Sequence, residues 1–239
     1  MNEVKERNKY LIAALGGFFL FFLGSIIYTF ILMLKEPSTD ILNDKYAMSI
    51  LQYLSYVPFT VFAVYILKDD LINDFRYFRK NFLKILVGAI VMFFAMYVIN
   101  FIVALIYEAL NIVGESANEE LINEILLSDA ALPMIISVVL LAPVAEELLF
   151  RKILFGVSEK TFKLKPILSI IISTLIFSFI HVSDLESLKY IFQYIPLAAI
   201  MCILYSYFNN NVYASILLHM MNNTFAVIMT YIAYSLGMM

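Results

Sequence analysis

Long apolar stretches follow one another along this chain of 239 residues, separated by short polar or charged segments. The hydrocarbon core of a bilayer is about 30 Å thick and an α-helix rises about 1.5 Å per residue, so roughly 20 apolar residues cross it once. Lipid offers no partners to backbone N–H and C=O groups, so these stretches are expected to be helices. We therefore predict an all-α, polytopic transmembrane helix bundle.

The apolar runs predict about seven spans and no separately folding soluble domain, so residues 1–239 are expected to form a single membrane domain. The segment 69–82 mixes charged residues with apolar ones at helical spacing, which suits a helix lying in the membrane interface or a solvated connector. The predicted spans are 10–34, 47–67, 83–107, 131–156, 166–183, 188–207 and 212–236.

Basic residues alternate between the two sides that these spans define. The segment from Glu108 to Asp129 contains no Lys or Arg. The positive-inside rule then places the N-terminus in the cytoplasm and the C-terminus outside, in a multi-pass protein of the cell membrane. Thirteen of the 16 Lys and Arg residues fall on one side: Lys5, Arg7, Lys9, Lys68, Arg76, Arg79, Lys80, Lys84, Arg151, Lys152, Lys160, Lys163 and Lys165.

Composition narrows the classes of partner. Hydrophobic residues make up 63% of the chain, which assigns it to the lipid bilayer. The formal net charge is only −3 and no basic run is interleaved with aromatic residues, so no nucleic-acid partner is expected. Cys202 is the single cysteine, so a disulfide framework and a cysteine-based zinc site are both ruled out.

Two adjacent glutamates, Glu146 and Glu147, lie in the fourth predicted span. A charge at the centre of a membrane helix costs about 2.5–3.5 kcal/mol on insertion scales, so both acids require compensation. Arg151 follows Glu147 by four residues, which is the order and spacing that favour an ion pair. Glu146 points in another direction without a local cation, which makes it the candidate general base. The alternative is a solvated helix end at the membrane surface.

The two histidines of the chain lie in later apolar spans. His181 ends the fifth span, where a histidine is often a structural hydrogen-bonding residue. His219 and Asn223 are four residues apart and so share one helix face, where they could simply join two helices. Their joint occurrence with a buried glutamate pair favours one common site over independent structural roles.

The sequence resembles the CAAX-processing and bacteriocin-processing (CPBP, or Abi) intramembrane proteases, also called type II CAAX prenyl endopeptidases. The resemblance rests on three intact motifs in order: Glu-Glu-x-x-x-Arg ending at Arg151, Phe-x-x-x-His from Phe177 to His181, and His-x-x-x-Asn from His219 to Asn223. It covers roughly residues 130–235, the expected catalytic core. The first three spans match this family only in being hydrophobic.

The resemblance implies that Glu146, assisted by His181, activates water for attack on a peptide carbonyl, while His219 and Asn223 stabilise the oxyanion. Glu147, Arg151 and Phe177 would support the site. We expect no cofactor, because the amide of Asn223 suits an oxyanion donor and is a poor zinc ligand. The alternative is a zinc ion held by Glu146, His181 and His219, since one carboxylate and two imidazoles also form a catalytic zinc set.

Helix lengths test whether these groups can meet. At about 1.5 Å per residue, Glu146 lies roughly 18 Å and His181 roughly 24 Å from the cytoplasmic ends of their spans. On the same basis Asn223 lies at roughly 18 Å and His219 at roughly 12 Å, so Asn223 is expected to match the depth of Glu146 better. The estimate predicts a site nearer the non-cytoplasmic face.

Two other classes of function compete with a protease. A membrane scaffold or peptide-immunity protein would carry degenerate motifs, and a proton-coupled transporter would show paired inverted repeats, which the sequence lacks. The expected partners are the lipid bilayer and a hydrophobic peptide or membrane-protein precursor as substrate.

Overall fold

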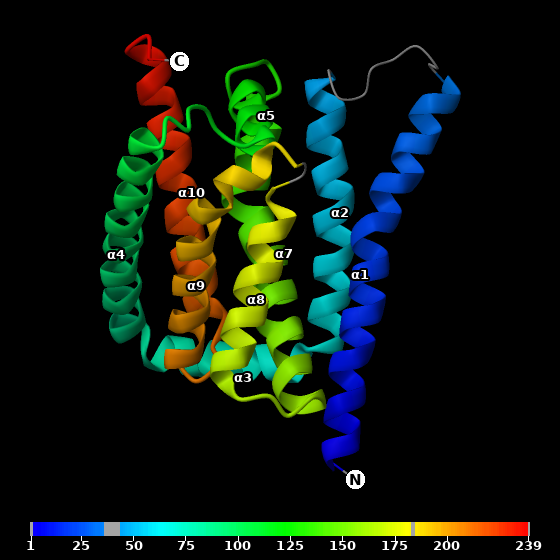
Figure 1. Ribbon diagram of the computed structural model, residues 1–239. Coiled ribbons are helices and arrows are strands. Elements are labelled where there is room, and N and C mark those ends of the chain that lie inside the picture. Colours follow the sequence, from blue (N-terminus) through cyan, green and yellow to red (C-terminus); the bar gives the residue numbers. More distant parts are fainter. Residues whose placement is uncertain (1, 36–43, 183–184, 239) are drawn as a thin grey trace.

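The computed structural model describes residues 2–35, 44–182 and 185–238, and these form a bundle of helices (Figure 1). Among the described residues, six helices are long and apolar enough to cross a membrane. They correspond to six of the seven predicted spans. The protein is thus a multi-pass helical membrane protein, as the sequence predicts.

Helix bounds follow the apolar runs closely. Three helices begin at side-chain caps: Asp44, Ser116 and Asn211 each accept a hydrogen bond from a backbone N–H of the first turn. In order along the chain, the elements are α1 (Asn2–Lys35), α2 (Lys45–Ile66), α3 (Lys68–Lys80), α4 (Phe82–Ala109), α5 (Ala117–Leu126), α6 (Ala131–Ile136), η1 (Ser137–Leu141), α7 (Ala142–Glu147), η2 (Leu148–Leu154), η3 (Val157–Thr161), α8 (Pro166–Ile180), η4 (Ser187–Tyr190), α9 (Ile191–Tyr207) and α10 (Val212–Ser235).

The fifth predicted span is shorter than expected. It was predicted over 166–183, but α8 ends at Ile180 after 15 residues, which is below the length of the other six. A helix of that length covers about 22 Å, less than the bilayer core. Residue 183 of the predicted span lies outside the described residues. The early end of α8 places His181 at the end of a helix inside the bundle.

The fourth predicted span, 131–156, is a continuous helix whose hydrogen-bonding register changes along its length. It alternates α-helical segments (α6 and α7) with π-helical ones, and it continues to Thr161 through η3. Short π-helical segments occur frequently at functional sites. This composite helix carries both glutamates and Arg151.

The predicted helix over 69–82 is confirmed as α3, which lies across one end of the bundle, roughly perpendicular to the long helices (Figure 1). The carboxylate of Asp74 on α3 pairs with Lys152 of η2 at 2.7 Å and accepts a hydrogen bond from the backbone N–H of Val212 at 3.2 Å. Its backbone carbonyl accepts a hydrogen bond from the side-chain amide of Asn211 at 2.7 Å. Asp74 therefore ties α3 to two of the helices that carry the candidate site.

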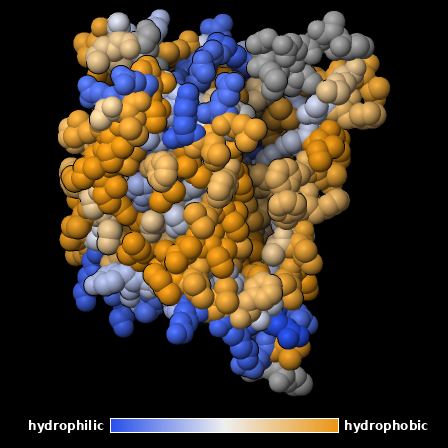
Figure 2. Space-filling model, in the orientation of Figure 1, coloured by the Kyte–Doolittle hydropathy of each residue, from blue (hydrophilic) through white to orange (hydrophobic). Residues whose placement is uncertain are grey.

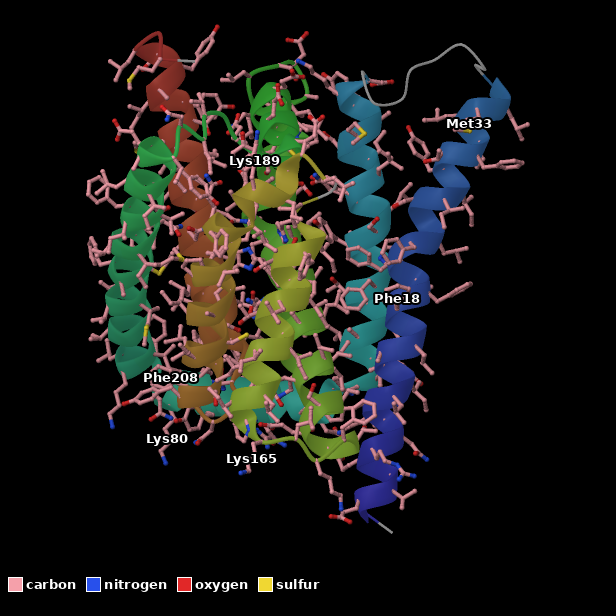
Figure 3. All side chains as sticks on the ribbon, in the orientation of Figure 1. Phe18, Met33, Lys80, Lys165, Lys189 and Phe208 are labelled. Atoms are coloured by element: carbon pink, nitrogen blue, oxygen red, sulfur yellow. The ribbon has the colours of Figure 1, made fainter. Side chains whose placement is uncertain are left out.

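Polar residues lie at the two ends of the bundle and an apolar belt lies between them (Figure 2). The N- and C-termini are at opposite ends (Figure 1). Lys80 and Lys165 lie at the end where the chain begins, whereas Lys189 lies towards the other end (Figure 3). This arrangement matches the alternation of charge along the sequence.

Candidate active site

The ion pair between Glu147 and Arg151 is the most deeply buried part of the site. Nη1 of Arg151 lies 3.1 Å from Oε1 of Glu147, and both side chains are fully buried. Nη2 of Arg151 donates to the carbonyl of Ala198 in α9 at 3.2 Å, and the guanidinium lies 4.6 Å from the ring centroid of Phe177. The alternative of a solvated helix end at the membrane surface is therefore wrong.

Glu147 also contacts His219 of the last helix, α10. Nδ1 of His219 lies 2.8 Å from Oε1 of Glu147, and His219 is buried. A carboxylate can only accept, so Nδ1 carries the hydrogen and Nε2 points the other way. This hydrogen bond orients the ring of His219 towards Glu146.

Glu146 lies between the two histidines. Its Oε2 atom is 3.9 Å from Nε2 of His181 and 3.8 Å from Nε2 of His219. Both distances exceed a direct hydrogen bond, and all three side chains line one cavity, so a water in that cavity can lie beside the three atoms and bridge them. The structure brings together side chains that are 35 to 73 positions apart in the sequence.

The early end of α8 orients His181. The last carbonyls of a helix lack intrahelical partners, and Nδ1 of His181 contacts the carbonyl oxygen of Phe177 at 2.9 Å. A carbonyl oxygen only accepts, so Nδ1 of this ring is also the donor and Nε2 faces Glu146. The imidazole stacks on Phe177 with ring centroids 4.2 Å apart and an interplanar angle of 23°.

Asn223 has a structural partner. Its Nδ2 donates to the backbone carbonyl of Val138 in η1 at 2.8 Å. In η1 the N–H of Ala142 donates to the carbonyl of Ser137, five residues earlier. In the same pattern the carbonyl of Val138 would accept from the N–H of residue 143, but Pro143 has no N–H. Asn223 therefore satisfies a carbonyl that Pro143 leaves without a backbone partner. Among the residues that the structure describes, the other hydrogen of Nδ2 has no protein acceptor.

The depth estimate from sequence was wrong about the last helix. His219, rather than Asn223, lies beside the two glutamates, and Asn223 lies one turn further along α10, beside Val138. The estimate assumed straight α-helices with a uniform rise. The π-helical segments of the fourth span break that assumption.

One cavity of about 220 Å³ contains Glu146, His181, His219 and Asn223 in its lining. All four predicted catalytic residues therefore face the same space. Helix α5 also contributes to the lining, and it connects the ends of α4 and α6 that lie away from the N-terminus (Figure 1).

A second, apolar cleft of about 420 Å³ reaches the same carboxylate from the side of α1. Its apolar walls come from α1, η2 and α8, including Phe18 of α1, which is labelled in Figure 3. Glu146 and His181 line both the cavity and the cleft. The polar site is therefore bordered on one side by a surface suited to apolar groups.

Sequence reasoning missed two residues of the site. Tyr56 of α2 donates to Oε1 of Glu146 at 3.1 Å, and Glu119 of α5 lines the cavity and accepts a hydrogen bond from Tyr194 at 3.2 Å. Burial raises the pKa of Glu119, an effect partly offset by His181 and the hydroxyl of Tyr194. Tyr56 has no sequence signal, because tyrosines are common in this chain. The capping sequence at Ser116 indicates a helix but not its contact with the site.

The fold and the buried site together define a helical, multi-pass membrane protein with a carboxylate and two imidazoles around one internal cavity. Residues 128–225 match the sequence model of the type II CAAX prenyl endopeptidase Rce1-like family. The match runs from just before α6 into α10 and includes all three motifs. This match indicates that the protein is a protease.

Two further comparisons returned nothing: no curated protein and no solved structure matches the chain. The family match and the geometry of the described residues are therefore the basis for a functional proposal.

Proposed function

We propose that this protein is an intramembrane endopeptidase that hydrolyses peptide bonds of a hydrophobic peptide or membrane-associated precursor. The observation that carries the proposal is the gap between Oε2 of Glu146 and the Nε2 atoms of His181 and His219, at 3.9 and 3.8 Å. Each histidine uses Nδ1 as a donor, so a neutral ring presents a lone pair at Nε2. Three acceptors around one gap favour a molecule that donates hydrogens, such as water.

Glu146 and His181 are assigned to water activation. Nδ1 of His181 donates to the carbonyl of Phe177, so Nε2 is the nitrogen that faces Glu146. A water in the gap can donate one hydrogen to this nitrogen and the other to Oε2 of Glu146. Transfer of a proton to Glu146 then leaves the oxygen free to attack the substrate carbonyl carbon.

His219 and Asn223 are assigned to the tetrahedral oxyanion. The carboxylate of Glu147 accepts from Nδ1 of His219 and stabilises the imidazolium that forms when Nε2 takes over the proton that the water gave to Glu146; the leaving amine receives this proton when the peptide bond breaks. A protonated Nε2 donates to the oxyanion, as does the second hydrogen of Nδ2 of Asn223. Preorganised donors in a lipid-shielded site are worth more than the same donors in water.

The apolar cleft supports a hydrophobic substrate. It reaches Glu146 from the surface formed by α1, so an apolar segment can approach from the lipid while its peptide bond enters the polar cavity. Residues 128–225 match the type II CAAX prenyl endopeptidase Rce1-like family, whose name refers to peptides that carry an apolar prenyl group. By the positive-inside rule we place the N-terminus in the cytoplasm and the C-terminus outside, with the cavity nearer the outside.

We propose that the reaction uses no metal ion. The zinc alternative would use Glu146, His181 and His219. Among the residues that the structure describes, no group of three or more His, Cys, Asp or Glu side chains is arranged to hold a metal ion. Treatment of the purified protein with a strong chelator, followed by an assay with and without added zinc, distinguishes the two mechanisms.

The decisive experiment compares the membrane peptides of cells that carry the wild type, Glu146→Ala, His181→Ala or Glu124→Gln. Glu124 is exposed on α5, so its variant controls for loss of a carboxylate. We expect peptides cut by the wild type and by Glu124→Gln to remain uncut with Glu146→Ala and with His181→Ala, without unfolding of the bundle. Full turnover by the Glu146→Ala protein would refute the assigned base.

A further inference from the structure

We propose that Tyr56 of α2 is a positioning residue for the catalytic carboxylate and holds Glu146 so that one oxygen faces both histidines. This inference rests on the proposed function, because it assigns a task to Tyr56 within that reaction. Tyr56 lies outside the segment that matches the protease family. It is therefore a part of the site that the three motifs do not contain.

The two oxygens of Glu146 have different surroundings. Oε1 accepts a hydrogen bond from the hydroxyl of Tyr56 at 3.1 Å, whereas Oε2 faces the Nε2 atoms of the histidines. A carboxylate can rotate about its last side-chain bond, whose torsion is broad. The hydrogen bond from Tyr56 fixes the position of Oε1, so Oε2 is the oxygen that faces the two histidines.

Tyr56 is itself held in place by packing. Its ring meets Phe21 of α1 edge to face, with centroids 5.7 Å apart, and Phe21 also packs on the buried Phe59 at 5.8 Å. An aromatic ring held in this way has little rotational freedom, so its hydroxyl is a fixed donor. The position of Glu146 is thus coupled to the packing of α1 against α2.

Helix α2 is bonded to the catalytic helix at three successive points. Tyr53 donates to the carbonyl of Pro133 at 3.0 Å, Gln52 accepts from Ser137 at 2.5 Å, and Tyr56 donates to Glu146. Two of these bonds involve tyrosine hydroxyls on neighbouring turns, and only the bond from Tyr56 reaches the carboxylate. Tyr53 therefore provides a matched control for Tyr56.

The experiment replaces each hydroxyl by hydrogen, with Tyr56→Phe and Tyr53→Phe proteins in lipid vesicles. The substrate is the peptide identified by the comparison of wild type with Glu146→Ala. A hydrogen bond to a charged group contributes enough to change a rate about ten- to hundredfold, so we expect kcat of Tyr56→Phe to fall by that factor with KM unchanged. Tyr53→Phe should keep the wild-type kcat.

Equal kcat in the two variants would overturn the positioning role, as would a raised KM with unchanged kcat in Tyr56→Phe. If Glu146→Ala is inactive while Tyr56→Phe is normal, only this inference fails. If Glu146→Ala is active, the proposed function fails.

A second measurement needs no substrate. Thermal unfolding of the wild type, Tyr56→Phe, Glu146→Ala and the double variant forms a double-mutant cycle. Removal of the Tyr56 hydroxyl should lower Tm less when Glu146 is already alanine, because the contact is then absent. Additive changes in Tm would show that the two side chains do not interact, which would end the inference.

Discussion

Oε1 of Glu147 accepts a hydrogen bond from Nδ1 of His219 at 2.8 Å and lies 3.1 Å from Nη1 of Arg151. One buried carboxylate oxygen therefore contacts both side chains. The second glutamate of the motif is thus a structural centre that joins the fourth span to α10. Glu146, one residue earlier, lies on the cavity side and is available for chemistry. Adjacent residues of a helix point about 100° apart, which allows the two acids to have separate roles.

Glu147→Ala should destabilise the protein by about 3–5 kcal/mol, because it leaves Arg151 buried without its carboxylate. Thermal unfolding in detergent measures the loss. The control is the double variant Glu147→Met/Arg151→Met, in which an apolar pair replaces the ion pair and most of the stability should return. The double variant should still be inactive, since His219 has lost its partner. If the double variant is as unstable as Glu147→Ala, the unpaired charge of Arg151 is not the cause of the lost stability.

Asn223→Ala should lower stability by about 0.5–1.5 kcal/mol, because the carbonyl of Val138 loses its donor. In a Pro143→Ala background the backbone can supply an N–H to this carbonyl, so Asn223→Ala should cost less stability there. Cleavage should be lost in both backgrounds, because the oxyanion donor is missing in each. Thermal unfolding and peptide cleavage are measured on the four proteins. Retained cleavage in Pro143→Ala/Asn223→Ala would show that Asn223 is only structural.

Glu119→Gln should raise Tm at neutral and alkaline pH but not in acid. Burial raises the folded-state pKa of Glu119 above its ordinary value. Between the two pKa values the folded protein binds more protons than the unfolded chain, so stability falls as pH rises through that window. The Tm difference from wild type should therefore be small at about pH 4 and positive at about pH 8. Glu120→Gln, an exposed neighbour, is the control, and a pH-independent difference for Glu119→Gln would contradict the explanation.

Gly24→Ala should separate α1 from α2. An added Cβ would lie 2.5 Å from the backbone oxygen of Leu54, which cannot move without the helix. Forcing an extra carbon into a packed interface costs about 1–3 kcal/mol, so Tm should fall. Leu15→Ala, on the exposed side of α1, should leave Tm near that of the wild type. An unchanged Tm in Gly24→Ala would show that the two helices do not pack closely at this point.

Much of the fold could be predicted from the sequence, because membrane spans are set by local composition. The helix bounds lie within several residues of the predicted ones, and α3 was predicted from its apolar spacing. The pairing of Glu147 with Arg151 was also predictable, since four residues separate neighbours on a helix surface. The length of α8 was not, because Ile180, His181 and Val182 continue an apolar run while the helix ends among them.

The amino-acid sequence alone determined that this chain crosses the membrane several times. It also determined the candidate reactive groups, which are Glu146, His181, His219 and Asn223. The tertiary structure decided which partners these groups have. His219 forms a hydrogen bond with Glu147, and Asn223 donates one to the carbonyl of Val138. Tyr56, from a helix distant in the sequence, donates one to Glu146. The physical reason is that apolar periodicity acts over a few residues, whereas the relative depth of two helices depends on local changes of register and on packing. A π-helical segment changes the direction in which the following side chains point, and an early helix end changes which groups its last residue can reach, so both select the partners of a side chain.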